Sequence, residues 1–428
     1  MYPSDIRYTF GNLNVFFDSP TKECVYDAPQ SVSGAADAGE WGEDVYYSVI
    51  RYKKEKVTRA LLGDSHVRSV VIATEKILHG LQRLRHVISF SPPKSVSIEE
   101  TLNDFHYNEN WNEIKHNVRI EQFVEGTMIN IFYTGRKWEI STKSIFSAET
   151  AFYSTKTFKD MFYEILPHHM LTHLFDPTLS YSVVMQHTDN RIVGPIFKRN
   201  LVIVGVYRVR QDDEKMDVDQ EEIQQKVSLI DVINMNAYRR DKEVEGTVFS
   251  QYFSFPIRYN TDEFQSYQSL INTFASPTGS TPYNVMGITL YNPATGKRSK
   301  IRNPSYEAVK YLRGETPGGP QTQYFSLLSR GVVDEFLRFF PEYYNQFAEY
   351  SSDYAKKVQF ISQCYLKCFV FKQKAHKSFE NVLLKQILFN VHSLYLNKYV
   401  VKVTPHAIER FLTTNMTPYQ LINFQLAE

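Results

Sequence analysis

Residues 286–303 (MGITLYNPATGKRSKIRN) combine a hydrophobic strand pattern with basic side chains that could bind phosphate. Lys300 and Arg302 stand at alternate positions, so in a β-strand both would project from the same face. Cations held together in this way can neutralise phosphate oxygens while charge moves to a leaving group. On its own, such a pair is also typical of a charged strand edge. The stretch is therefore compatible with a phosphate site and with an ordinary edge strand.

Residues 121–127 (EQFVEGT) place a carboxylate and a glycine, Glu125 and Gly126, directly before another hydrophobic strand pattern. A carboxylate at such a place could contact a ribose or a metal ion. Two residues earlier stands Phe123, whose phenyl ring cannot attack phosphorus as a lysine amine can. Covalent chemistry therefore needs an amine from elsewhere in the chain.

The elements that must position these side chains are predicted to be β-strands. Four runs between 116 and 210 have strand composition, namely 128–133, 137–142, 181–186 and 201–210. Arg68 lies in an earlier strand-like run, and Lys143 follows the second of the four. Each of these cations alone is typical of a solvated or ion-paired side chain. The acidic segment 211–225 (QDDEKMDVDQEEIQQ) predicts a solvated loop.

The last third of the chain has a different character. Beyond the Gly- and Pro-rich segment 314–320, apolar residues recur at helical spacing and predict four to six helices. We therefore expect an α+β protein of three parts. These are an N-terminal extension at 1–60 with a glycine-rich mobile loop at 31–43, a β-rich domain at 61–318 with insertions near 211–225 and 250–284, and a helical domain at 319–428.

The composition of the chain limits the classes of function that it can have. The 428 residues include 48 basic and 47 acidic side chains, which argues against a bulk nucleic-acid binder but leaves room for a local basic groove. Three cysteines favour a reducing compartment such as the cytoplasm, and Cys364 and Cys368 are expected to be buried thiols. No apolar run approaches the roughly 20 residues of a membrane span. Histidines and carboxylates form no metal motif in the sequence, so we expect no metal site.

The order of these segments resembles that of the phage-type ATP-dependent RNA ligases, and more closely their relatives in large DNA viruses of eukaryotes. The resemblance covers about residues 60–315. It is carried by 66–72 (HVRSVVI), by Glu125-Gly126-Thr127, by 140–145 (ISTKSI), by 183–193 (VVMQHTDNRIV) and by 300–302 (KIR). It implies an antiparallel β, ATP-grasp-like nucleotidyltransferase domain followed by a helical domain. The nucleotide-binding residues that it implies are Arg68, Glu125, Gly126, Lys143, Lys300 and Arg302.

The chain departs from the family pattern at three positions where the family has a charged catalytic residue. The family's nucleophilic lysine corresponds to Phe123, an expected acid corresponds to Val184, and an expected glutamate corresponds to Met286. We therefore expect a pseudoenzyme that binds a nucleotide or RNA ends, or acts as a scaffold in a viral or RNA-processing assembly. ATP and Mg²⁺ remain possible ligands by resemblance. The helical domain is rich in aromatic residues and could bind a protein partner.

Two other functions stay open. The chain could be an active RNA ligase that forms its lysyl-AMP on a non-standard lysine, and Lys242 in 242–246 (KEVEG) is the candidate. Its spacing is one residue longer than the motif requires, which on a strand turns the side chain to the opposite face. The chain could instead be a structural protein that binds neither nucleotide nor RNA. In each case we expect it in the cytoplasm, or in the host cytoplasm or a virion if it is viral.

Overall fold

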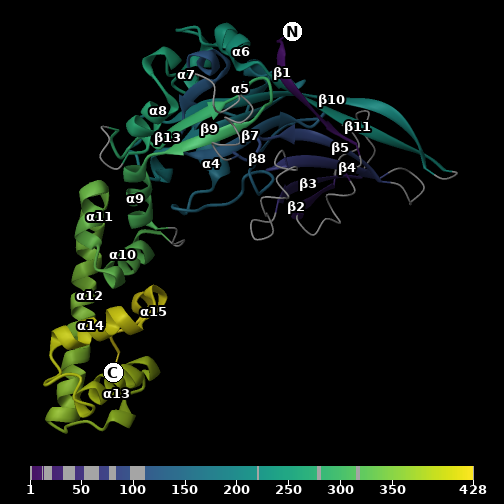
Figure 1. Ribbon diagram of the computed structural model, residues 1–428. Coiled ribbons are helices and arrows are strands. Elements are labelled where there is room, and N and C mark those ends of the chain that lie inside the picture. Colours follow the sequence, from purple (N-terminus) through teal and green to yellow (C-terminus); the bar gives the residue numbers. More distant parts are fainter. Residues whose placement is uncertain are drawn as a thin grey trace. The chain divides into compact units, whose positions relative to one another are not determined.

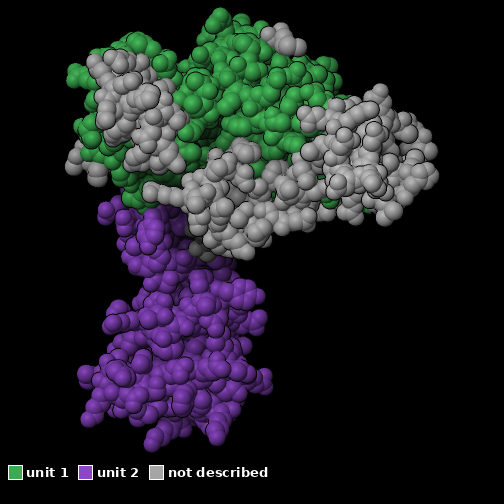
Figure 2. Space-filling view, turned by 45° about the vertical axis from the view of Figure 1, so that its right-hand side comes forward, with its two compact units in different colours: residues 1–151, 156–308 green, residues 152–155, 309–428 purple. Residues whose placement is uncertain are grey.

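The structure is a computed structural model that describes residues 2–11, 13, 22–31, 44–52, 67–76, 83–96, 111–218, 221–276, 281–314 and 319–427. The chain divides into two compact units, which Figure 2 colours separately. The first consists of residues 1–151 and 156–308, and the second of residues 152–155 and 309–428. The first is rich in mostly antiparallel strands and the second is helical, so the predicted α+β class is confirmed.

The first unit contains a large sheet whose strands, in spatial order, are β1, β11, β10, β9, β7 and β8, with β12 beside β10 (Figure 1). Their bounds are β1 Ser4–Phe10, β7 Thr127–Tyr133, β8 Trp138–Thr142, β9 Leu179–Gln186, β10 Asn200–Val218, β11 Glu221–Ile233 and β12 Phe253–Ser254. The strands predicted at 128–133, 137–142, 181–186 and 201–210 are confirmed. The β-branched and aromatic composition of these runs was the correct signal.

Two smaller sheets complete the β-structure. One has the order β2, β3, β4, β5, with bounds Lys22–Ser31, Asp44–Tyr52, Val70–Lys76 and Arg83–Phe90. The other has the order β14, β13, β6, with bounds Arg298–Arg302, Gly287–Tyr291 and Arg119–Gln122. The glycine-rich loop predicted at 31–43 lies, beyond Ser31, outside the described residues.

The prediction of a loop at 211–225 is wrong. The long strands β10 and β11 continue outward as a two-stranded hairpin, paired in register from Asp212 with Val227 to Val218 with Glu221. Backbone pairing can form a strand from polar as well as apolar residues, so an acidic composition alone does not predict a loop. The polar composition that suggested a loop is what a solvated ribbon also requires.

Helices cover the large sheet and form its main core. They are α4 Phe158–Ile165, α5 Met170–Leu174, α6 Met235–Lys242 and α7 Val248–Tyr252. Their apolar faces meet buried residues of β7, β8, β9 and β10, including Ile131, Ile140, Val183 and Ile203. A second core joins the four-stranded sheet to the large one through Val70, Val87, Phe90, Tyr207 and Ile230. Stacking two sheets in this way holds β4 and β5 against β10 and β11.

The three-stranded sheet has its own core. One of its faces carries Ile120, Ile288, Leu290 and Ile301, all buried together with Trp111 and Phe274. The covering elements are α3 Trp111–Ile114, η3 Lys115–Asn117, η5 Thr261–Glu263 and α8 Tyr267–Phe274. Because side chains alternate along a strand, the remaining residues of β6, β13 and β14 project from the opposite face.

The second unit contains six α-helices in the described part of 319–427, which agrees with the predicted four to six. The elements are α10 Gly319–Arg330, α11 Val333–Phe339, η6 Pro341–Tyr343, α12 Tyr344–Tyr365, η7 Leu366–Val370, η8 His376–Ser378, α13 Val382–Leu396, α14 Pro405–Asn415 and α15 Pro418–Asn423. The connecting helix α9 spans Pro304–Arg313. Cys364 and Cys368 are buried cysteines, as predicted. No described helix is long and apolar enough to cross a membrane.

Candidate phosphate-binding site

The face of the three-stranded sheet opposite its core carries charged and aromatic side chains. Register places Glu121, Thr289 and Lys300 side by side across β6, β13 and β14. The next row outward consists of Arg119, Tyr291 and Arg298. Sequence alternation therefore puts Arg298, Lys300 and Arg302 on this face together. Of these three, only Lys300 and Arg302 were identified from the sequence. Arg298 extends the same alternation by one step, and that signal would have found it.

Phe123 closes one end of this face. It directly follows β6, and its backbone N–H donates to the carbonyl of Gly287 at 2.9 Å. Lys300 Nζ lies 4.2 Å from the centre of the Phe123 ring, and the guanidinium carbon of Arg302 lies 5.7 Å from it. Lys300 and Arg302 therefore both place their cationic groups over the ring of Phe123. The negative face of an aromatic ring attracts positive charge.

Gly287 makes the close approach of these groups possible. Its φ is +128°, and a Cβ there would lie 2.1 Å from the carbonyl oxygen of Ile301. In register Gly287 stands opposite Arg302. Only a residue without a side chain fits between the Phe123 end of β6 and the last residue of β14.

Lys300 shows that this face has an excess of positive charge. Burial, followed in order by the charges of Arg298, Arg68, Arg302 and Lys143, lowers the pKa of Lys300 to about 6. These four cations therefore lie within electrostatic reach of one amine. Four of the residues singled out from the sequence, Arg68, Lys143, Lys300 and Arg302, thus come together from separate parts of the first unit. We call this group, with Arg298, the cationic cluster.

Carboxylates near the cluster are already engaged. Glu121 accepts ion pairs from Arg119 at 3.0 Å and Arg258 at 3.2 Å. Arg302 pairs with Glu307 at 2.7 Å. Among the described residues, no carboxylate forms an ion pair with Lys300. An anionic ligand would supply the missing negative charge, whereas a divalent cation would be repelled by the cluster. The donor set therefore fits phosphate groups and does not fit a Mg²⁺ ion held by the protein.

Glu125 has a positioning role in the structure. Its carboxylate accepts hydrogen bonds from the backbone N–H groups of Val193 at 2.8 Å and Gly194 at 3.0 Å. Nearby, Asn190 donates to the hydroxyl of Thr127 at 2.8 Å. The segment around 125–127 is thereby tied to 190–194, and the sequence had singled out these two stretches separately. Any nucleotide contact by Glu125 remains a prediction.

Gly126 and Val184 form an apolar contact at the start of β7. A Cβ on Gly126 would lie 2.4 Å from the carbonyl oxygen of Met185 and 2.7 Å from a methyl group of Val184. Val184 itself is buried with Val124 and Val202. The position where the resemblance implies an acid is therefore filled by a small hydrophobic core, in which an unpaired carboxylate would be costly.

Lys242 lies in a different setting. It ends helix α6, rather than standing on a strand, and pairs with Asp241 at 3.3 Å. It is not among the cations that lower the pKa of Lys300. The premise that its side chain faces the wrong side of a strand is therefore wrong, since no strand is present there.

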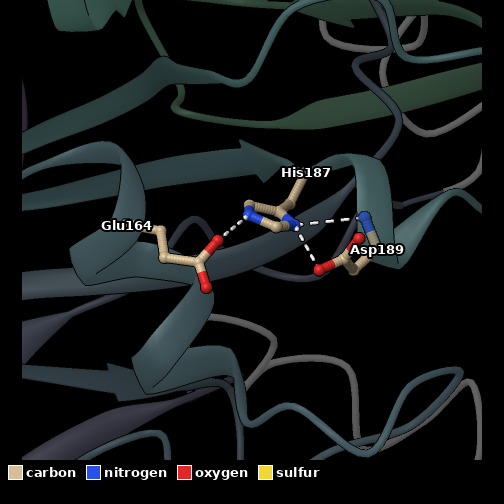
Figure 3. Close-up of side chains that lie close together, drawn as sticks. All are labelled: Glu164, His187 and Asp189. Atoms are coloured by element: carbon tan, nitrogen blue, oxygen red, sulfur yellow. Dashed lines mark hydrogen bonds and ion pairs between the residues drawn. The ribbon is translucent and has the colours of Figure 1, made fainter.

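A second charged group, which sequence analysis missed, contains Glu164, His187 and Asp189 (Figure 3). His187 is completely buried and its Nε2 lies 3.0 Å from Glu164. Its Nδ1 accepts a hydrogen bond from the backbone N–H of Asp189 at 3.1 Å. The ring is therefore neutral, with its proton on Nε2, and burial lowers the pKa of His187 in agreement with this state.

Both carboxylates of this second group are neutralised by cations. Lys156 Nζ lies 2.6 Å from Glu164 and 2.7 Å from Asp189, and Arg199 lies 3.1 Å from Glu164. Each histidine nitrogen also has a partner, so the charges of this group are compensated by residues of the protein itself. We call this group the balanced cluster. Residues 164 and 187 are far apart in the sequence, so their spacing could not predict the balanced cluster.

Comparisons with known proteins give only distant similarities. No family model matches the chain, and no curated protein matches it in sequence. Among solved structures, a mutant of the RNA ligase of Naegleria gruberi with AMP and Mn has 9% identity and a TM-score of 0.34, covering 67% of this chain and 97% of that one. A second mutant of that ligase, with ATP and Mn, has 9% identity and a TM-score of 0.32, with the same coverages. Similarity at this level transfers no residue's role, so the roles below follow from this chain's own side chains.

Proposed function

We propose that the chain is an RNA ligase-like protein that binds the phosphates of a nucleotide or of an RNA end at the cationic cluster without forming a covalent intermediate at position 123. A role as a scaffold in an RNA-processing or viral assembly would follow from such binding. The observation that carries the proposal is Lys300, whose amine stands over Phe123 at 4.2 Å and whose pKa is lowered to about 6 by burial and by surrounding cations.

The physical reason is the excess positive charge around Lys300. Neighbouring cations repel the charged form of this amine and raise the free energy of the unliganded site. A triphosphate or a 5′-phosphate supplies several anionic oxygens that can accept hydrogen bonds from lysine and arginine. Binding therefore relieves the repulsion and adds charge-assisted hydrogen bonds. ATP fits this site through its phosphates, and an RNA end would fit it through its terminal phosphate.

Equilibrium binding tests the proposal. Labelled ATP and a 5′-phosphorylated RNA oligonucleotide should both bind the full-length chain, with affinity that falls as salt rises. Lys300→Met should weaken both interactions, whereas the matched variant Lys242→Met should leave them unchanged. Equal binding by the two variants, or no binding at low salt, would contradict the proposal and favour a structural protein without these ligands.

A second candidate function uses the same amine as a nucleophile. A lysine with a pKa near 6 is mostly neutral at pH 7 and has a free lone pair, which is the activated state required for covalent catalysis. The Nζ of Lys300 would attack the α-phosphorus of ATP, forming an N–P bond while the α–β P–O bond breaks. Pyrophosphate leaves with the electron pair, and the amine releases a proton to solvent.

Covalent labelling separates the two candidates. The chain is incubated with α-labelled ATP, with and without Mg²⁺, and then denatured. Label that stays on the wild type and is lost in Lys300→Met, but not in Lys242→Met, would establish an adenylated Lys300. Absence of label, together with reversible ATP binding, supports the binding function alone.

A further inference from the structure

The second unit carries a strongly basic segment at 366–402. It contains seven lysines, at 367, 372, 374, 377, 385, 398 and 402, against a single carboxylate, Glu380. The whole chain is nearly neutral at +1, so this segment holds a charge excess that the remaining residues offset. Such a local concentration of one sign is the electrostatic footprint of a polyanion-binding surface.

Four of these lysines lie in the segments on either side of helix α13. Lys372 and Lys377 lie between η7 and α13, and Lys398 and Lys402 follow α13. All four are exposed. In the described part of the chain, their ammonium groups form no hydrogen bond or ion pair with other residues. Their charges are therefore available to an external anion.

Aromatic rings form a continuous series between these segments. Phe369 stacks on His392 with ring centres 3.9 Å apart and an interplanar angle of 15°. Tyr395 continues the series on one side of His392, at 6.0 Å. On the other side, His376 lies 6.0 Å from Phe369 and 6.2 Å from Phe389. The two terminal rings are open to solvent, since Phe389 is 62% and Tyr395 is 47% exposed.

The rings in the middle of the series are held in place by hydrogen bonds. His392 Nδ1 lies 3.1 Å from the hydroxyl of Tyr365. His376 Nε2 donates to the backbone carbonyl of Lys385 at 2.7 Å. These fixed rings contact Phe389 and Tyr395 and limit their movement, so the exposed pair loses less conformational entropy when a flat ligand stacks on it.

We propose that residues 366–402 form a binding surface for single-stranded RNA that is separate from the cationic cluster. The exposed rings of Phe389 and Tyr395 would stack on bases, and the lysines of the two segments would contact phosphates. Stacking of this kind contributes about 1–3 kcal/mol per base and tolerates any sequence. The surface would therefore bind RNA with little sequence preference, and would not require a terminal phosphate.

A lipid membrane fits this surface less well. A helix that lies on a membrane presents one strongly apolar face to the lipid. In α13 that face is already used, because Leu384, Ile387, Leu388 and Val391 are buried in the unit's own core. The exposed residues of α13 are Val382, Phe389, Tyr395 and Leu396 together with the polar Gln386 and Asn390. Rings interspersed with polar groups suit base stacking better than insertion into lipid.

The test uses the full-length chain and a fluorescent oligouridylate with a 5′-hydroxyl end, which offers the cationic cluster no terminal phosphate. Phe389→Ala and Tyr395→Ala should each weaken binding about 5- to 150-fold, corresponding to about 1–3 kcal/mol for one stacked base. Lys372→Glu/Lys377→Glu should also weaken binding and should lower the slope of log affinity against log salt by about 1.4, at about 0.7 per phosphate contact.

Control variants show whether the effect belongs to this surface. Arg338→Glu/Lys356→Glu reverses two exposed cations of the same unit outside 366–402 and should leave binding unchanged. Phe389→Ala and Tyr395→Ala should leave ATP binding unchanged, so that failure here differs from failure at the cationic cluster. Thermal unfolding of each variant must match the wild type. The proposal is overturned if the control and test variants bind alike, or if the chain binds phosphatidylserine vesicles through these residues and not the RNA.

Discussion

The cationic cluster and the balanced cluster contain similar side chains and differ in how charge is compensated. Around His187, two carboxylates meet Lys156 and Arg199 at distances of 2.6–3.1 Å, and both ring nitrogens have partners. Around Lys300, cations accumulate and the amine lies over an aromatic ring. The first arrangement is complete without a ligand. In the second arrangement, an anion would reduce the repulsion between the cations. This difference distinguishes a structural network from a binding site.

The largest expected effect concerns the glycine that shapes the cationic cluster. Gly287→Ala should lower the free energy of unfolding by about 3 kcal/mol, because its Cβ would lie 2.1 Å from a backbone oxygen in a left-handed conformation. Gly246→Ala is the matched control, since Gly246 also has a positive φ but nothing within 4 Å of its Cβ. Thermal or urea unfolding measures both. Equal losses would show that the close approach at Gly287 is unimportant.

The next effect separates the two clusters by ligand binding. Lys300→Met should weaken ATP binding by about 2 kcal/mol, or about 30-fold, because a charge-assisted hydrogen bond to phosphate is lost. It should not destabilise the fold, since it removes a buried amine that forms no ion pair with a carboxylate of the described residues. Titration calorimetry and thermal unfolding measure the two quantities. A destabilised variant with unchanged ATP affinity would show that Lys300 stabilises the fold and does not bind the ligand, which would contradict the distinction between the two clusters.

For the balanced cluster we expect the opposite result. His187→Ala should lower the free energy of unfolding by about 1–2 kcal/mol, because buried hydrogen bonds to Glu164 and Asp189 are lost. ATP affinity should not change. His169→Ala, at an exposed histidine of the same unit, serves as the control and should have no effect on stability. Loss of ATP binding in His187→Ala would show that this group also serves the ligand.

The smallest effect is a proton taken up on binding. With a pKa of about 6, the amine of Lys300 is mostly neutral at pH 7.5, and a bound phosphate favours its charged form. Binding of pyrophosphate should therefore take up part of a proton at pH 7.5 and almost none at pH 5, where the amine is already charged. Calorimetry in buffers of different ionisation enthalpy measures this uptake. It should disappear in Lys300→Met, and uptake that persists there would assign the proton to another group.

The sequence predicted more of the fold than of the charge network. Strands β7, β8 and β9 were found because they are rich in β-branched and aromatic residues, which favour strands, and nearly all of β9 is buried. Arg68, Lys143, Lys300 and Arg302 were found through a family resemblance, and the structure brings them together. The pairing of Glu164 with His187 depends on how α4 covers the large sheet, which no local pattern reveals. The ion pairs of Glu121 with Arg119 and Arg258 could likewise not be predicted from a local sequence pattern.

The β10–β11 ribbon has a consequence for solubility. Beyond residue 212 its two strands pair only with each other in the described part of the chain, so both outer edges present unpaired backbone groups. Exposed edges of this kind invite strands from other molecules and start aggregation. The sequence there is dense in acidic residues, with Asp212, Asp213, Glu214, Asp217, Glu221 and Glu222 along its length. Like charges at this density in the sequence oppose pairing between two copies of the segment, and this offsets the hazard of its unpaired backbone edges.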